Sequence, residues 1–252
     1  MKTRSRFSNN NNDNNDNNKR RRYNQLEIFV QPPKEDNFGL ELGNHFPALR
    51  VIMPNGASMA LNNDGKIIRC VLNLSDPAQW TGEVGKANLS HWAGNHCAAG
   101  CTARAAEIIK QHKELIAQGY SIQIVVSTVD PKDLAAIIKV QTQRYKDYHQ
   151  KTFNETLDDD FRLPVTFVAL EAKSRQHLAA KYGHAKFPFR GDDYLSATTY
   201  RLDDNQIVFK LKHTHVDLAT FDASKPDNVC AQDAKQIVEA AKSKPGVSLE
   251  KN

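Results

Sequence analysis

Apolar residues along this chain recur with the two periods that distinguish strands from helices. Short apolar runs bounded by turn residues predict strands, and they lie at 48–53, 66–74, 121–129 and 165–170. The runs 66–74 and 121–129 are almost continuously apolar, which predicts strands that are buried on both faces. Two further runs, 197–202 and 206–212, flank Asp203-Asp204-Asn205 and predict a β-hairpin.

Helical periodicity separates the predicted strands. The segment from about Cys101 to Gln118 is expected to form a helix that Gly119 ends. Its apolar face is predicted to consist of Ala105, Ile108, Ile109, His112 and Ile116. A second helix over 132–151 is expected to bury Ala135, Ile138, Thr142 and Tyr145 or Lys146, and further helices are expected over 174–182 and 231–242. Strands that alternate with helices, plus one hairpin, predict an α/β fold.

The N-terminal part of the chain differs sharply from the rest. Residues 1–22 hold seven basic and two acidic residues, which account for the whole formal net charge of +5, and most of the others are Asn. With almost no apolar surface to bury, we expect residues 1–24 to be a disordered basic tail ahead of one domain over 25–252, in which 26–30 forms an edge strand. No leader with an apolar core and no membrane-length apolar run is visible, so a cytoplasmic location is the expectation.

The candidate chemistry lies between the first two buried runs. A long loop, Ser75 to Asn95, is predicted to lead into the helix, and Cys97 and Cys101 lie four residues apart where the loop becomes helical. The free N–H groups and partial positive charge of a helix start favour a thiolate, so we expect an accessible, acidic and reactive thiol at Cys101. Cys70, inside a predicted core strand, is expected only to pack.

Several short motifs carry a resemblance to a known family, and their order is that of the family. Gly100-Cys101-Thr102-Ala103-Arg104-Ala105 is similar to the G-C-T-x-E-A sequence around the reactive cysteine of bacterioferritin-comigratory-type peroxiredoxins. Other stretches that resemble peroxiredoxin motifs follow at Phe46–Leu61, Cys70–Leu74, Ile124–Pro131, His177–Gly183 and Thr198–Phe209. The resemblance covers roughly residues 45–242.

The resemblance implies a thioredoxin-like, peroxiredoxin-type fold, with a central mixed sheet flanked by helices. It also implies thiol-dependent redox chemistry, either peroxide reduction or disulfide exchange, with Cys101 as nucleophile and Cys97 beside it. The partners it implies are a thiol reductant such as a thioredoxin-type protein and a second copy of the chain. No specific nucleic acid is expected, because the chain outside the tail has no net charge.

The chain also departs from the family pattern. Ala98 stands where a threonine is expected, Gly94 where a proline is expected, and Leu195 near the position of an arginine. Those side chains would stabilise the reacting peroxide. Ala106 replaces a resolving cysteine. The same residues therefore leave open a second hypothesis, a redoxin scaffold that has lost peroxidase chemistry and serves in binding or structure.

Three other arrangements of these side chains remain open. The C-x-x-x-C spacing also resembles Sco-type copper chaperones, which implies a Cu(I) or Zn site formed by His91, His96, Cys97 and Cys101. His213 or His215, followed by Asp217, could serve a Cys–His–Asp hydrolase, although strand-end surface histidines are the simpler interpretation. Cys230 could resolve a sulfenic acid formed at Cys101.

Overall fold

The computed structural model describes residues 39–74, 89–127, 133–181, 197–213, 216, 221–222 and 225–243, and for 89–99 and 180 it describes the backbone alone. The predicted tail, the strand predicted at 26–30 and the domain boundary at 24/25 lie outside these residues. So do Leu195 and His215.

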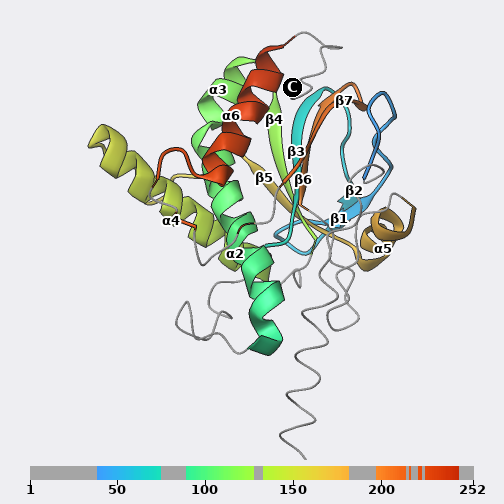
Figure 1. The fold of residues 1–252 in the computed structure, drawn as a ribbon, viewed down its shortest axis with the longest axis horizontal. Helices are drawn as coiled ribbons and strands as arrows, with labels where there is room; N and C mark the ends of the chain where they lie inside the picture. The colour runs from blue at the N-terminus through green and yellow to red at the C-terminus, as the bar shows by residue number, and fades with distance from the viewer. Residues whose placement is uncertain are drawn as a thin grey trace, which may run out of the picture. The chain divides into compact units, whose positions relative to one another are not determined.

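Seven strands form one mixed sheet in the order β2-β1-β5-β4-β3-β6-β7 (Figure 1). Its centre is parallel, because β4 pairs in parallel with β3 on one side and β5 on the other, and antiparallel pairs complete both edges. The strands are β1 (Arg50–Ile52), β2 (Ser58–Ala60), β3 (Lys66–Leu72), β4 (Ser121–Val126), β5 (Thr166–Leu170), β6 (Thr198–Asp203) and β7 (Gln206–Lys212). The strands predicted within the described residues are thereby confirmed.

Helices cover both faces of the sheet, with α5 on one face and the other helices on the opposite face (Figure 1). They are α2 (Leu89–Lys110), α3 (His112–Ala117), α4 (Leu134–Phe153), α5 (Ala172–Lys181) and α6 (Val229–Lys242). A parallel β-α-β unit joined to an antiparallel hairpin in one helix-covered sheet is the thioredoxin-like arrangement, so the predicted fold class is confirmed. None of the described helices has the length and apolar composition that a bilayer crossing requires.

The local signals for turns act as predicted. Asp204 and Asn205 connect β6 to β7 with φ values of 46° and 69°, the left-handed pair that a tight two-residue hairpin needs. Gly119, at φ +84°, ends α3 by donating its N–H to the Ile116 carbonyl at 2.8 Å. The predicted central strand is also confirmed, because Cys70 is fully buried on β3 and pairs with Ile124 of β4.

Three expectations about the helices are wrong. The loop predicted to reach Asn95 ends earlier, because residues 89–95 already belong to α2. The helix expected to run unbroken to Gln118 is interrupted at Gln111, which shifts the phase of α3, so that Leu115 is buried and Ile116 is 44% exposed. On α4 the buried face is Leu134, Ile137, Gln141, Tyr145 and His149.

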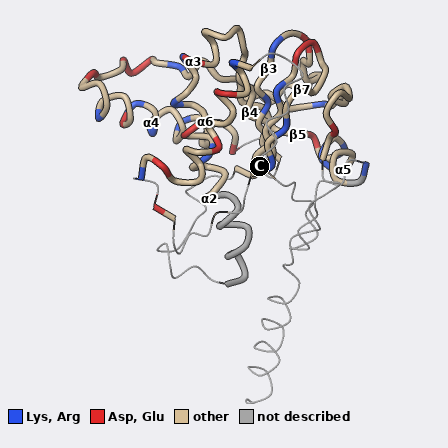
Figure 2. Tube along the Cα trace, turned by 45° about the horizontal axis from the view of Figure 1, so that its top comes forward, with Lys and Arg blue, Asp and Glu red and all other residues tan. Residues whose placement is uncertain are grey.

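The α4 face was predicted one residue out of phase. The stripes that begin at Leu134 and at Ala135 both carry apolar residues at helical spacing, and both include Tyr145. A contact from α2 selects the first stripe, because the Gln141 Nε2 donates to the Thr102 carbonyl at 3.2 Å. Tyr145, which both stripes share, meets the His112 ring of α3 edge-on with centroids 5.1 Å apart. Basic and acidic residues are interspersed along the outer side of α4 (Figure 2).

An arginine is buried in the middle of β3, on the face of the sheet opposite α2. Arg69 donates hydrogen bonds to the Gln123 and Asn63 side chains and to the Asn62 carbonyl, and its guanidinium lies 4.3 Å from the Phe46 ring centroid. Burial lowers the pKa of Arg69 to about 9. The apolar appearance of the 66–74 run gave no sign that this charge would be enclosed.

Candidate functional site

Cys101 is not at the start of a helix. It lies near the middle of the 22-residue α2, several turns from Leu89, and its side chain is 3% exposed. The free N–H groups of a helix end act only within about the first turn, so they do not reach this thiol. Burial raises the pKa of Cys101, and the positive charge of Arg104 and a hydrogen bond from the Asn73 backbone N–H offset only part of that rise. The expectation of an accessible, acidic thiol at a helix start is therefore wrong.

The other residues of the predicted metal site follow the same helix. The backbone of α2 carries His91, His96 and Cys97, whose side chains lie outside the description. Residues on an α-helix are rotated by about 100° each around the axis, so neighbouring His96 and Cys97 start from different sides of α2. Cys97 and Cys101 lie one turn apart on nearly the same side. Among the described side chains, no group of three or more His, Cys, Asp and Glu is arranged to hold a metal ion.

A second thiol lies beside Cys101. Cys230 is the second residue of α6, is fully buried, and its Sγ lies 3.9 Å from the Gly100 carbonyl oxygen. Cys230, rather than Cys101, thus occupies the first turn of a helix. Burial nevertheless raises the pKa of Cys230 to about 11; the charge of Arg104 lowers it, while Asp233, Glu107 and Cys101 raise it further.

An ion pair lies one helical turn beyond the two thiols. The Nε of Arg104 on α2 donates to the Oδ2 of Asp233 on α6 at 2.9 Å. The same oxygen lies 3.0 Å from the Nδ1 of His213, and the other ring nitrogen, Nε2, lies 2.8 Å from the Thr199 Oγ1. These four side chains are at most 7% exposed. They form a continuous buried chain of polar contacts from α2 through α6 and the end of β7 to β6.

The contacts set the protonation of this chain. Because burial lowers the pKa of His213, we assign it as a neutral imidazole that donates from Nδ1 to the Asp233 carboxylate and accepts at Nε2 from the Thr199 hydroxyl. Burial lowers the pKa of His213, the hydrogen bond to Asp233 opposes that effect, and the Arg104 charge adds to it. Burial alone would raise the pKa of Asp233, but the hydrogen bonds and charge from His213 and Arg104 outweigh it and leave that pKa below its ordinary value.

This arrangement predicts how stability depends on pH. The pKa of His213 is lower in the folded protein than in the unfolded chain, where it is near 6.5, so the folded imidazole binds a proton only at lower pH. The unfolding free energy that His213 contributes is therefore fully present above pH 6.5 and is lost as the pH falls through that value toward the lower folded pKa. The unfolding free energy that Asp233 contributes is likewise lost as the pH falls below its ordinary pKa of 3.8.

In His213→Asn, which keeps an N–H donor for Asp233 but cannot titrate, denaturation curves between pH 7 and 5 should show a flatter pH dependence. A slope equal to that of the unaltered protein would contradict this assignment, and the exposed His177→Asn is the control.

Gly100 allows the elements around the thiols to approach closely. A Cβ at this position would lie 3.1 Å from the Val216 Cβ and 3.7 Å from the Arg104 Nη1. The guanidinium of Arg104 therefore folds back along α2 toward Gly100, where the Cys230 thiol also lies. The absence of a side chain at Gly100 is what leaves room for Val216, whose Cβ and Cγ2 would lie 3.1 and 3.2 Å from a Cβ there.

The sequence interpretation missed most of this cluster. His213 was expected at the surface, but it is buried and contacts the Asp233 carboxylate on α6. Its ring nitrogens contact Asp233 and Thr199 and no cysteine, so the hydrolase arrangement with His213 is not formed. A signal was present in the helices. Arg104 lies on the same stripe as Cys101, Ala105 and Ile108, and Asp233 shares its stripe with Ala234 and Ile237. Opposite charges on the apolar stripes of two helices indicate a buried ion pair.

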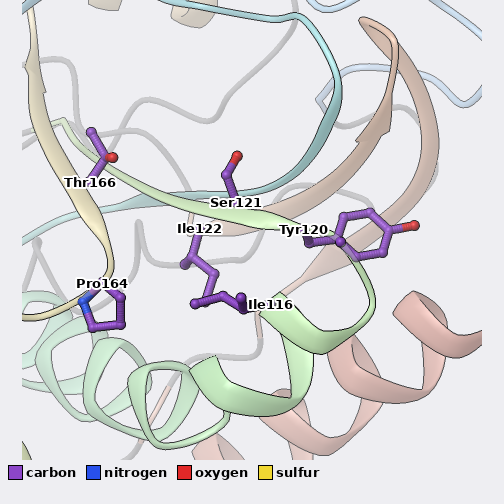
Figure 3. A pocket seen from close by; sticks show the side chains of 7 residues that line it. Ile116, Tyr120, Ser121, Ile122, Pro164 and Thr166 are labelled. Carbon is purple, nitrogen blue, oxygen red and sulfur yellow. The ribbon is translucent and has the colours of Figure 1, made fainter.

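A cavity of about 420 Å³ lies elsewhere, between the start of β4 and α3 (Figure 3). Its walls include Ile116, Tyr120, Ile122 and Pro164. Asn73, which contacts Cys101, follows the end of β3, whereas the cavity adjoins the first residues of β4. Because β3 and β4 are parallel, the cavity and the thiols lie toward opposite ends of these strands.

Comparison with known proteins gives structural matches only. No family model matches the chain, and no curated protein matches its sequence. The solved structures similar to it include the peroxidoxin BcpB from Mycobacterium tuberculosis, with 13% identity, a TM-score of 0.48, and coverage of 81% of this chain and 97% of that one.

Two further solved structures are of the same kind. A thiol:disulfide interchange protein from Bacteroides sp. matches with 13% identity and a TM-score of 0.45, over 81% of this chain and 92% of that one. Peroxiredoxin Q from Xanthomonas campestris matches with 12% identity and a TM-score of 0.44, over 77% of this chain and 89% of that one. At such identities these structures say nothing about activity, and the thioredoxin-like fold of this chain rests on its own strand order and directions.

Proposed function

We propose that this chain is a thiol-dependent redox protein with Cys101 as its nucleophile. The observation that carries the proposal is the meeting of two buried thiols from different helices, Cys101 and Cys230, beside the guanidinium of Arg104. A thiolate needs a nearby cation to form inside a protein, and Arg104 supplies one there. Within the described residues this is the place where thiols and a cation come together.

The chemistry would proceed in two steps if the oxidant is a peroxide. The Cys101 thiolate attacks one peroxide oxygen and the O–O bond breaks. The leaving oxygen takes up the proton that the thiol lost on ionisation, so the products are a Cys101 sulfenic acid and water or an alcohol. A second thiol then attacks the sulfenic sulfur, forming a disulfide and releasing water. A dithiol reductant such as a thioredoxin-type protein restores both thiols by exchange. If the oxidant is instead a disulfide, the exchange steps alone suffice.

Helix geometry favours Cys230 over Cys97 as the second thiol. Side chains four residues apart on one helix have Cβ atoms about 5–6 Å apart. A disulfide needs about 3.8 Å, so a Cys97–Cys101 bond would distort α2. Cys230 projects from a neighbouring helix and reaches the Gly100 carbonyl without any distortion of α2.

The test is direct trapping of the sulfenic acid. The reduced full chain is treated with dilute hydrogen peroxide and a dimedone-type probe, and modified cysteines are identified by peptide mass spectrometry. We expect slow labelling at Cys101, because a thiol that is 3% exposed reacts only when its surroundings open. Cys230→Ser should increase the trapped amount, Cys101→Ser should abolish it, and Cys70→Ala should leave it unchanged.

A second function is favoured by one observation. The three described thiols, Cys70, Cys101 and Cys230, are all buried with raised pKa values, which is the condition of inert structural cysteines. A redoxin scaffold used for binding would have this property. Absence of sulfenic acid and of any disulfide after peroxide or oxidised dithiol treatment would favour the scaffold. Tight Cu(I) or Zn binding that is lost in Cys97→Ala and in Cys101→Ala would favour the chaperone-like site with His91 and His96.

A further inference from the structure

The two helices that carry the thiols share a spacing. On α2 a charged residue, Arg104, follows Cys101 by three positions, and on α6 Asp233 follows Cys230 by three. Cys230 contacts Gly100, and Asp233 contacts Arg104, at sequence separations of 130 and 129 residues. Contacts at a nearly constant separation mean that the two helices run in the same direction and in register. The ion pair therefore lies one turn beyond the thiols.

A buried carboxylate holds the Arg104 guanidinium on the side of α2 that carries Gly100. Its Nε donates to Asp233, and its Nη1 lies 3.7 Å from the point where a Gly100 Cβ would be. An arginine side chain has many rotamers, and holding it in one of them has an entropic cost. A charge-assisted hydrogen bond to a buried carboxylate is strong enough to hold it.

The carboxylate is held in turn. Asp233 Oδ2 also accepts from His213 Nδ1, and His213 Nε2 accepts from the Thr199 hydroxyl, which belongs to the sheet. Thr199 is fully buried on β6, where it pairs with Cys70 of the central strand β3. The chain of contacts thus ends in the buried centre of the sheet.

We propose that Asp233, His213 and Thr199 are positioning residues that hold the Arg104 guanidinium beside Cys101 and Cys230, so that a thiolate formed on either cysteine faces a fixed cation. This inference rests on the proposed redox function. Among the residues that the structure describes, the charged groups that act on the two thiols are Arg104 and Glu107 on α2 and Asp233 on α6, and His213 lies beside Asp233. Arg104 is the cation among them.

The electrostatics of the thiols agree with this placement. The Arg104 charge lowers the pKa of both Cys101 and Cys230 against the effect of burial, while Asp233 and Glu107 raise the pKa of Cys230. The balance depends on how far the guanidinium lies from each sulfur. That distance is what the contacts from Asp233 back to Thr199 hold constant.

The experiment measures thiol titration in the reduced full chain labelled with [13C]cysteine. The pH dependence of the Cβ chemical shifts reports each thiol whether or not reagents can reach it. In Arg104→Met we expect the pKa of Cys101 and Cys230 to rise by about one unit, a tenfold smaller thiolate population at lower pH, which corresponds to 1.36 kcal/mol. Arg104→Lys keeps the charge but not the fork-shaped contact, so the pKa of the two thiols should rise by less than in Arg104→Met. Cys70 is the internal control in these variants.

Thr199→Val is the decisive variant for the positioning role. It touches neither Cys101 nor Cys230 and changes no charge, but it removes the hydroxyl that donates to His213. We expect the pKa of Cys101 to rise in this variant too, by less than in Arg104→Met. Because Thr199 is also hydrogen-bonded to Cys70, that cysteine is not a control here. An unchanged Cys101 titration in Thr199→Val would overturn the positioning role.

A further variant guards against misfolding. Should Arg104→Met fail to fold because Asp233 is left charged and buried, Arg104→Met combined with Asp233→Asn removes both charges. Cys101 should still titrate higher than in the unaltered protein, and an unchanged titration would overturn the inference. The redox function is tested separately. If the titration shifts are present but the unaltered protein forms no sulfenic acid, the redox function is wrong and the positioning of Arg104 stands.

Discussion

Replacing Asp233 with alanine should lower the unfolding free energy by about 3–5 kcal/mol, the usual consequence of removing one partner of a buried ion pair. The carboxylate is 5% exposed and satisfies two donors at once, the Nε of Arg104 and the Nδ1 of His213. Its loss removes the Asp233 charge from beside a buried guanidinium and the Asp233 acceptor from a buried imidazole N–H. Neither group can reach water without disturbing the packing of α2 on α6.

Denaturant unfolding followed by circular dichroism measures this loss. Lys235→Ala, at an exposed position on the same helix, is the matched control and should change stability by no more than about 0.5 kcal/mol. Asp233→Leu combined with Arg104→Met removes both charges and should recover much of the stability that the single change loses. A loss below about 1 kcal/mol in Asp233→Ala would show that the ion pair is not enclosed as described.

The second large effect is expected in the centre of the sheet. Ile124→Ala should cost about 2–5 kcal/mol, because it removes a fully buried side chain from a strand that is paired on both sides and cannot move to fill the space. Ile124 is 0% exposed and pairs with Cys70 on β3 and Phe167 on β5. It belongs to the same apolar cluster as Cys101.

The matched control is Ser121→Ala at the exposed first residue of β4. Its hydroxyl makes one long contact, 3.4 Å to the Lys66 carbonyl, so the change should be close to neutral. Thermal unfolding of both variants compares the two positions on one strand. Equal losses at Ile124 and Ser121 would contradict the assignment of β4 as the central buried strand.

The arrangement of the thiols bears on how fast any redox reaction can be. Cys101 shares its apolar cluster with Ile108 and Ile109 of the same helix and with Ile237 of α6. A thiol in such surroundings meets an oxidant only after local opening, whereas a thiol in the first turn of an exposed helix meets it at once. The proposed activity is therefore expected to be slow, with a rate that rises in variants that loosen the contact between α2 and α6.

Local sequence features determined the strands and the ends of the elements. Apolar runs of strand length, Asp204-Asn205 in a hairpin turn and Gly119 after a helix act through contacts within a few residues, so they can be interpreted without the fold. The motif around Cys101 likewise placed it on the helix that follows β3. These predictions succeed because each depends on backbone preference or on a short period of apolar residues.

Only the tertiary structure decided what surrounds the thiol. Whether Cys101 starts a helix or lies in its middle depends on how far α2 extends before it. Asn88 and Asn95 are both of a residue type that favours a helix start, so the sequence did not choose between a start at Leu89 and a later one. Three features depend on contacts between elements that are separated in the chain, by up to 130 residues. They are the burial of His213, the pairing of Asp233 with Arg104, and the approach of Cys230 to Gly100. Such contacts form because the sheet brings these elements together, and a charge on an apolar stripe becomes a buried partner only when the opposite charge arrives from the neighbouring helix.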